Sequence, residues 1–361
     1  MNKHRKWTIA VLAVLALFLL LNYAIWKLYT QDLLDHGDGW MVGDLARTGY
    51  IPGSRQPRKN TDTLPRRHIK SSEYAGQQAT VVTVGDSFSN GIGGGENRFY
   101  QDWIASLNGF DVLNVQPLPS VTEIDTIAIL LNSGYLKQVG AKHVVMEVVA
   151  REIYPTYLQW QKKFDFDETR DLKSLNSLLA KLRWEHRVPK VAFVNSGNLK
   201  FVFNTLAYRF DDNAFFSDVF SARLDRPMFT APEGDRLLFY RNDIEYVAAI
   251  NTRLDRLEKL NADLNALADR LAQQGIRLYF MPAVDKYDLY AGFLVDNPYP
   301  KNAFFESFRK LDKRYTFIDT KGILLRELES GKKDIFHADD THWNWKASRR
   351  IFENVGFQPL R

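Results

Sequence analysis

The stretch that decides the fold is ATVVTV at residues 79–84, followed directly by GDSFS at residues 85–89. A short run of valine and threonine that ends at glycine is typical of a buried strand. Further apolar runs of this kind lie at residues 111–115, 143–149, 276–281 and 315–318. Continuous apolar runs, in contrast to alternating ones, indicate parallel strands with both faces covered.

Helical patterns separate these strands, at residues 98–107, 122–139 and about 243–274. Strands that alternate with helices predict an α/β fold with three layers around a parallel sheet. In such sheets, ligands bind beyond the carboxyl ends of the strands, and Ser87 falls at such an end.

A second block, Asp339-Asp340-Thr341-His342-Trp343, lies close to the end of the chain. A serine hydroxyl is a weak nucleophile until a neighbouring base accepts its proton. His342 is the candidate base, and Asp340 is the candidate acid that would orient it. Taken alone, Ser87 could simply cap a helix and His342 could be a surface histidine. Together, the two blocks predict an enzyme that transfers acyl groups through a serine nucleophile.

Composition and motifs argue against several other classes of protein. The net charge of +5 is modest and the basic residues are spread along the chain, which argues against nucleic-acid binding. The chain has no cysteine, so it has neither disulfides nor thiolate ligands. The glycines that follow Ser87 lack the lysine of a phosphate loop and the spacing of a dinucleotide site. We therefore expect no cofactor and no metal.

The N-terminus is almost entirely apolar from residue 7 to residue 29, long enough to cross a bilayer. Lys3, Arg5 and Lys6 precede this segment, and Asp32, Asp35 and Asp38 follow it. The asymmetry predicts a single-pass anchor in the cell inner or plasma membrane (residues 1–30), with its N-terminus cytoplasmic and the catalytic domain periplasmic or extracellular. The alternative is a cleaved signal peptide, but no small-x-small cleavage site follows the apolar core.

Two further segments divide the rest of the chain. Residues 31–75 are basic and rich in glycine and proline, which predicts a solvated tether; the alternative is contact with lipid headgroups or an anionic polymer. Residues 76–361 form the predicted catalytic domain, with an insertion at about 155–240. The insertion is rich in aromatic residues, which form either the core of a subdomain or a cap that presents aromatic faces to sugars or a partner. These residues are Tyr157, Trp160, Phe164, Trp184, Phe193, Phe201, Phe203, Tyr208, Phe215, Phe216, Phe220, Phe229, Phe239 and Tyr240.

The GDSFS turn and the late Asp/His block resemble the SGNH (GDSL-type) hydrolase superfamily. The form Asp340-Thr341-His342-Trp343 resembles its alginate O-acetyltransferase X/J-like branch. One anchor followed by an external domain is similar to the B-type peptidoglycan and wall-polysaccharide O-acetyltransferases.

The resemblance implies an SGNH-like fold in which Ser87 is the nucleophile and His342 the base. Asp340 matches the acid of the Asp-Thr-His-Trp form, whereas Asp339 matches the acid of the more usual Asp-x-x-His form. Asn114 falls near the family's second block and is a candidate oxyanion donor. Arg151 stands after the strand where the family has Gly-x-Asn, so it is a candidate donor or sugar contact; alternatively it pairs with Glu147 or Glu152.

The function that the resemblance implies is O-acetyl transfer to a cell-envelope or secreted polysaccharide through a serine acyl-enzyme. A multipass membrane O-acyltransferase would then be the partner that supplies acetyl groups. The alternatives are a polysaccharide acetyl esterase with the same triad and a non-catalytic accessory protein of the membrane acyltransferase.

Overall fold

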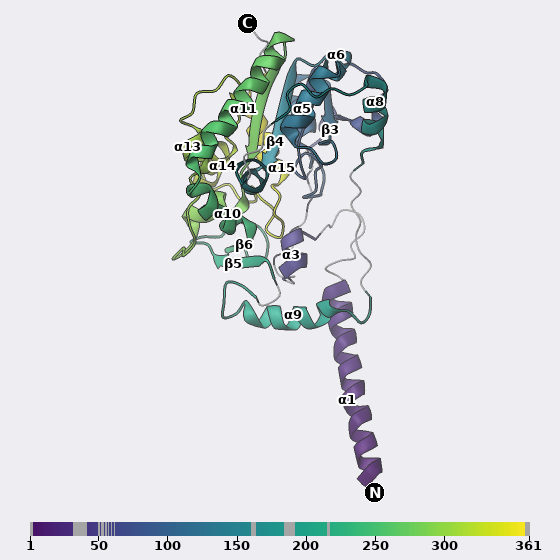
Figure 1. The fold of residues 1–361 in the computed structure, drawn as a ribbon. Helices are drawn as coiled ribbons and strands as arrows, with labels where there is room; N and C mark the ends of the chain where they lie inside the picture. Colours follow the sequence, from purple (N-terminus) through teal and green to yellow (C-terminus); the bar gives the residue numbers. More distant parts are fainter. Residues whose placement is uncertain are drawn as a thin grey trace.

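The computed structural model describes residues 3–31, 42–49, 51, 54, 56, 58, 60, 62–159, 164–183, 192–214 and 217–357 of the 361-residue chain. Its centre is a six-stranded parallel sheet with the strand order β1-β3-β2-β4-β7-β8 (Figure 1). The strands are β1 (Ile69–Lys70), β2 (Val81–Val84), β3 (Val112–Val115), β4 (His143–Val149), β7 (Arg277–Ala283) and β8 (Thr316–Phe317). A separate antiparallel hairpin consists of β5 (Val219–Arg223) and β6 (Arg236–Tyr240).

Helices cover both faces of the sheet. On one face α5 and α11 contact each other and the central strands, and on the other α15 contacts both α4 and α14. The helices are α1 (Lys3–Ile25), α3 (Asp44–Gly49), α4 (Tyr100–Asn108), α5 (Glu123–Asn132), α6 (Tyr135–Val139), α7 (Ala150–Ile153), α8 (Leu172–Lys181), α9 (Ser196–Ala207), α10 (Asn242–Asn251), α11 (Leu254–Gln273), α12 (Lys286–Tyr290), α13 (Phe304–Phe308), α14 (Thr320–Glu329) and α15 (Trp345–Glu353). The prediction of a mixed α/β fold with a covered parallel sheet is confirmed.

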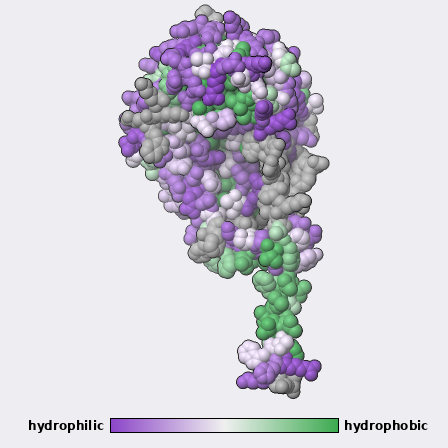
Figure 2. Space-filling view, turned by 45° about the vertical axis from the view of Figure 1, so that its right-hand side comes forward, coloured by the Kyte–Doolittle hydropathy of each residue, from purple (hydrophilic) through white to green (hydrophobic). Residues whose placement is uncertain are grey.

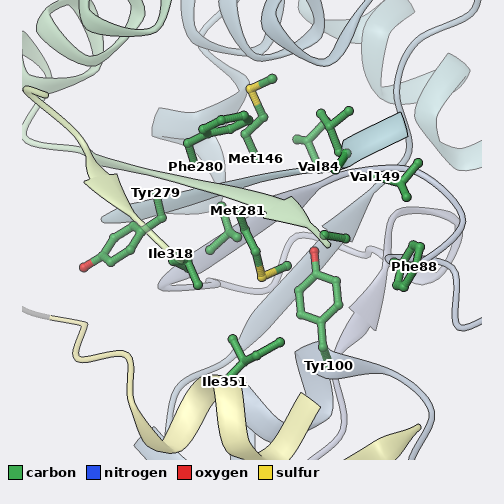
Figure 3. Close-up of a cluster of buried hydrophobic side chains, with 14 of the residues drawn as sticks. Val84, Phe88, Tyr100, Met146, Val149, Tyr279, Phe280, Met281, Ile318 and Ile351 are labelled. Atoms are coloured by element: carbon green, nitrogen blue, oxygen red, sulfur yellow. The ribbon is translucent and has the colours of Figure 1, made fainter. Parts of the chain in front are cut away.

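The core explains why the strands read as continuous apolar runs. All four residues of β2 and all seven of β4 are buried. Figure 3 shows side chains alternating along β7: Phe280 points to one face of the sheet, and Tyr279 and Met281 to the other. Both faces therefore need apolar residues.

The five predicted strands are present to within a few residues, but two predicted helices are interrupted. The segment 122–139 is divided at Gly134, which takes a left-handed conformation with φ of +77° between α5 and α6. The long segment 243–274 is divided into α10 and α11 at residues 252–253. Strand β1 and the β5–β6 hairpin were not predicted.

The predicted insertion contains α8, α9 and the hairpin. Some of its aromatic residues are buried, among them Phe229 and Phe239, whereas Phe203 is exposed. The predicted aromatic residues Trp160, Trp184, Phe215 and Phe216 lie outside the described residues.

Helix α1 and the π-helical turn Trp26–Thr30 form one continuous apolar segment. Within Lys3–Thr30 a stretch of 18 residues has a mean hydropathy of 2.5, and the segment is long and apolar enough to cross a membrane. It projects from the domain as a largely apolar stalk (Figures 1 and 2). Asp32, Asp35 and Asp38, the acidic side of the predicted flank asymmetry, lie outside the described residues.

Part of the predicted tether is packed into the domain. Gln56 and Arg58 are buried, and α3 packs on the β5–β6 hairpin. The prediction of a solvated segment is therefore wrong for these residues, although Arg66 and Lys70 further along are exposed. Arg55 and Lys59 lie outside the described residues.

Candidate active site

The serine turn follows β2 and packs closely against buried side chains. A Cβ atom on Gly85 would lie 2.3 Å from Ser89 Oγ and 2.4 Å from Glu147 Oε2, so a larger residue there would displace these two side chains. The Asp86 carboxylate accepts a hydrogen bond from the backbone N–H of Val149 at 2.8 Å, which ties the turn to the end of β4. Ser87 therefore sits at the carboxyl ends of two neighbouring strands.

The structure brings Ser87, His342 and Asp340 into one hydrogen-bonded chain. Ser87 Oγ lies 2.8 Å from His342 Nε2, and His342 Nδ1 lies 2.6 Å from Asp340 Oδ1. Asp340 Oδ1 also accepts a hydrogen bond from the backbone N–H of His342 at 2.9 Å, and this second contact fixes the carboxylate against the imidazole. The nucleophile and the base are 255 residues apart in sequence.

The electrostatics of the pair favour a charged carboxylate beside a basic imidazole. Burial opposes the charged form of both groups, but their mutual attraction outweighs it. The pKa of Asp340 is held well below its usual value by His342 and Arg58, and the pKa of His342 is raised by Asp340. An imidazole of raised basicity accepts a serine proton more readily.

Asp339 faces away from His342. Its carboxylate accepts two hydrogen bonds from the Arg58 guanidinium, at 2.8 and 3.2 Å, and a third from the backbone N–H of Gly43 at 3.1 Å. Arg58 also reaches Asp340 at 3.4 Å. Of the two candidate acids, Asp340 is the one that lies against the imidazole.

Lys286, in the first turn of α12, holds the loop that carries Asp340 and His342. It is fully buried, and its ammonium group donates to the backbone carbonyls of His337, Ala338 and Asp340 at 2.7, 2.8 and 3.1 Å. Burial lowers its pKa to about 8, although Asp339 and Asp340 oppose this shift. A single cation thus holds three carbonyls of the segment that carries the base.

Sequence reasoning missed Asp44, which reaches the site from α3. Its carboxylate accepts hydrogen bonds from the backbone N–H of Thr341, at 2.7 Å, and from the Thr341 hydroxyl, and its Oδ2 lies 3.8 Å from His342 Nδ1. The preceding Gly43 has no room for a side chain, since a Cβ atom would lie 1.9 Å from the Asp339 carbonyl oxygen. A glycine next to an aspartate in a supposed tether was the only local signal.

Glu147 is a buried carboxyl group beneath the serine turn. Its Oε2 accepts the backbone N–H groups of Asp86 and Ser89, at 3.1 and 3.2 Å, and the Ser89 hydroxyl at 2.8 Å. Burial and the charge of Asp86 raise its pKa well above the ordinary value. This shift favours the neutral form of Glu147, which acts as an acceptor that shapes the turn.

Asn114 and Arg151 make other contacts than those expected of them. Asn114 donates from Nδ2 to the Ser89 carbonyl at 3.0 Å, so it stabilises the serine turn. Arg151 pairs with Asp243 and Asp285, at 3.5 and 3.3 Å, and not with either of the expected glutamates.

Two cavities lie near the site. One of about 400 Å³ is lined by Arg151 and by Asp44 and Thr341, which are hydrogen-bonded to each other next to His342. Another of about 570 Å³ borders the loop after Ser87 and includes Asn114 and the basic residues Lys70, Arg98 and Arg183. Both volumes fall within the range of about 300–1,000 Å³ that is usual for small-molecule sites.

Asp44, Asp340 and His342 also form a set of potential metal ligands, with ligand atoms within 4.8 Å of one another. A cation bound through His342 Nδ1 would have to displace the 2.6 Å hydrogen bond to Asp340. The same atoms therefore serve either a triad or a metal, and a chelator distinguishes the two.

No protein-family model, no curated protein and no solved structure matches this chain. The chemistry must therefore be argued from the site itself. A serine hydroxyl that is hydrogen-bonded to a carboxylate-backed imidazole can attack an acyl carbon and carry the acyl group.

Proposed function

We propose that this chain is a serine-dependent acyl-transfer enzyme. The observation that carries the proposal is the hydrogen-bonded chain Ser87–His342–Asp340, with distances of 2.8 and 2.6 Å. It joins residues from two distant blocks at the carboxyl edge of a parallel sheet, where α/β enzymes bind their substrates.

The geometry supports a two-step reaction. His342 Nε2 accepts the proton of Ser87 Oγ while the oxygen attacks the carbonyl carbon of an acyl donor, and the imidazolium then gives this proton to the leaving group. In the second step His342 takes a proton from the acceptor hydroxyl, whose oxygen attacks the acyl carbon, and the imidazolium returns this proton to Ser87 Oγ as the bond between Ser87 Oγ and the acyl carbon breaks. Asp340 stabilises the imidazolium in both steps. Within the described residues no acceptor is found for the backbone N–H of Ser87, which makes it a candidate oxyanion donor.

We further propose that the acyl group is acetyl and that the acceptor is a hydroxyl of a cell-envelope or secreted polysaccharide. The resemblance of the two motifs to SGNH-type O-acetyltransferases supports this substrate class. The apolar helix α1 supports an anchored enzyme, and a multipass membrane acyltransferase is the proposed source of acetyl groups. The proposed topology places the N-terminus in the cytoplasm and the domain outside.

The test uses the full chain in detergent, an activated acetyl ester as donor, and envelope oligosaccharides as acceptors. Acetylated sugar, detected by mass spectrometry and lost in both Ser87→Ala and His342→Ala, is the expected result. Acetate release that no acceptor alters, together with deacetylation of native polymer, would reassign the enzyme as an esterase.

Two further arms complete the experiment. Activity that persists in Ser87→Ala but disappears with EDTA would replace the triad with a metal site at Asp44, Asp340 and His342. No acyl chemistry with any donor, in a chain that still folds, would favour an accessory protein.

A further inference from the structure

Helix α9 exposes an apolar stripe on the surface of the domain. The stripe residues lie three, four and seven positions after the first one, which places them on one side of the helix. They are Leu199, Val202, Phe203 and Leu206, each 46 to 58% exposed, and Phe210 just beyond the helix is 84% exposed.

The opposite side of α9 faces the protein and is partly polar. Asn198 and Asn204 are buried there, next to Phe201 and Tyr208. Asn204 donates to the Gly49 carbonyl at 3.4 Å, and Asn198 is bonded to residues of α1 and the turn after it. The helix therefore buries two amides beside Phe201 and exposes Leu199, Phe203 and Leu206, although large apolar side chains are usually withdrawn from water.

Three hydrogen bonds attach α9 and the residues just before it to the end of α1 and the turn that follows α1. Asn198 Nδ2 donates to Asn22 Oδ1 at 2.7 Å, Thr30 Oγ1 donates to Asn198 Oδ1 at 2.6 Å, and Asn22 Nδ2 donates to the Phe193 carbonyl at 2.8 Å. Tyr29 stacks on Phe201 with ring centroids 4.5 Å apart. In Figure 1, α9 crosses the domain end of α1 with its axis across that of α1.

The place of this junction along α1 matches the edge of a bilayer. The segment from Trp7 to Trp26 is about 30 Å long at the helical rise of 1.5 Å per residue, close to the thickness of the hydrocarbon core. Trp26 packs edge-on against Phe193, which precedes α9, with ring centroids 5.6 Å apart. Aromatic residues at this depth are typical of the membrane–water boundary.

We propose that the apolar stripe of α9 lies in the bilayer interface, in the same membrane that α1 crosses. The occupant of this face is the boundary between lipid headgroups and acyl chains, because the stripe continues from the apolar surface of α1. In Figure 2 the apolar stalk meets apolar surface on the underside of the domain. Lys200 and Arg209 lie along the same segment, where they can reach headgroup phosphates. This inference does not depend on the proposed acyl chemistry.

Binding to membranes cannot test the proposal, because α1 alone would anchor the chain. The depth of α9 in the bilayer can test it, and the chain suits this measurement because it contains no cysteine that would react with the label. We would place single cysteines at Val202, Phe203 and Leu206, attach an environment-sensitive fluorophore, and reconstitute the full chain in nanodiscs of phosphatidylcholine and phosphatidylglycerol. Matched controls carry the label at Thr205, exposed on the flank of α9, and at Glu258, exposed on α11.

The expected result is several-fold stronger quenching of the stripe labels than of the Glu258 label by nitroxides on the lipid chains, with weak quenching by aqueous iodide. Strong iodide quenching of the stripe labels would overturn the proposal. Shielding from both quenchers would also overturn it, and would assign the stripe to a protein, either a second copy or a membrane partner. Phe203→Asp combined with Leu206→Asp should make a label at Leu199 accessible to iodide while the chain stays folded, as judged by far-UV circular dichroism.

Discussion

Asp340 Oδ1 lies 2.6 Å from Nδ1 of His342, whereas the adjacent Asp339 turns its carboxylate toward Arg58. Two neighbouring aspartates thus have different tasks: one contacts the base and the other neutralises a buried cation. This division yields the first prediction.

We expect Asp340→Asn to lower kcat by on the order of 10³- to 10⁴-fold, because the amide no longer favours the required tautomer or stabilises the imidazolium. Asp339→Asn should retain most of its kcat in the folded fraction and should lose stability instead. Steady-state kinetics with an acetyl ester and thermal unfolding separate the two effects. An Asp339→Asn variant with normal stability and the larger loss of kcat would reverse the assignment.

The acid limb of the pH profile should reflect His342. Below its pKa the imidazole is protonated and cannot accept the Ser87 proton, so activity is low in acid and rises with pH. Because Asp340 raises that pKa, the midpoint of kcat/KM should lie above the ordinary histidine value of about 6.5. In Asp340→Asn the residual activity should have a midpoint at lower pH. An unchanged midpoint in that variant would show that another group controls the limb.

Lys286 should control the alkaline limb. Its pKa is lowered to about 8, so above that pH it loses its charge and one of the three donors that hold the loop carbonyls. We expect activity to fall above about pH 8 in the parent chain. Lys286→Met should have lower activity throughout and no alkaline limb near that pH, whereas Lys310→Met, at an exposed lysine, should keep the parent profile. An alkaline limb that persists in Lys286→Met would contradict this role.

Arg58 should contribute strongly to stability. Its side chain is almost fully buried between Asp339 and Asp340, so Arg58→Met leaves carboxylates without a counter-charge and should cost about 3–5 kcal/mol of unfolding free energy. Arg66→Met is the matched control, because its pair with Asp111 is exposed and should cost at most about 1 kcal/mol. Urea unfolding of both variants in the same detergent gives the comparison, and equal losses would refute the buried role.

Glu147 should tolerate replacement by glutamine but not by alanine. Because its raised pKa favours the neutral form, Glu147→Gln keeps a neutral acceptor for Ser89 and should change stability by less than about 1 kcal/mol. Glu147→Ala leaves buried donors unsatisfied and should cost about 1–3 kcal/mol, with a loss of kcat because the serine turn shifts. Equal losses of stability in the two variants would contradict the role of a neutral acceptor.

The parallel sheet and the Ser87 and His342 blocks were accessible from sequence because each is a local pattern, and the two blocks were paired because a serine nucleophile needs a base. A buried strand appears in the sequence as an apolar run. The turn directly after β2 places Ser87 at the carboxyl edge of the sheet, independently of the rest of the chain. The choice of Asp340 over Asp339 came from a resemblance, since both aspartates are close enough to His342 in sequence.

Asp44 and Arg58 could not be found in this way. Each acts through contacts with residues more than 280 positions away, within a segment whose composition is that of a solvated linker. Burial of a charged residue is visible in sequence only when its counter-charge is adjacent, and here Asp339 lies at the other end of the chain. The contacts of Arg151 were mispredicted for the same reason: Asp243 and Asp285 are distant, whereas Glu147 and Glu152 are near.

The short helix α3 links α9 to the loop that carries the candidate base. On one side Ala46 packs with Phe201 of α9, and on the other Asp44 holds Thr341 next to His342. If α9 lies in the bilayer interface as proposed, this link would hold Ser87 at a fixed height above the membrane. The proposed acetyl transfer would then reach only hydroxyl groups that pass close to the membrane.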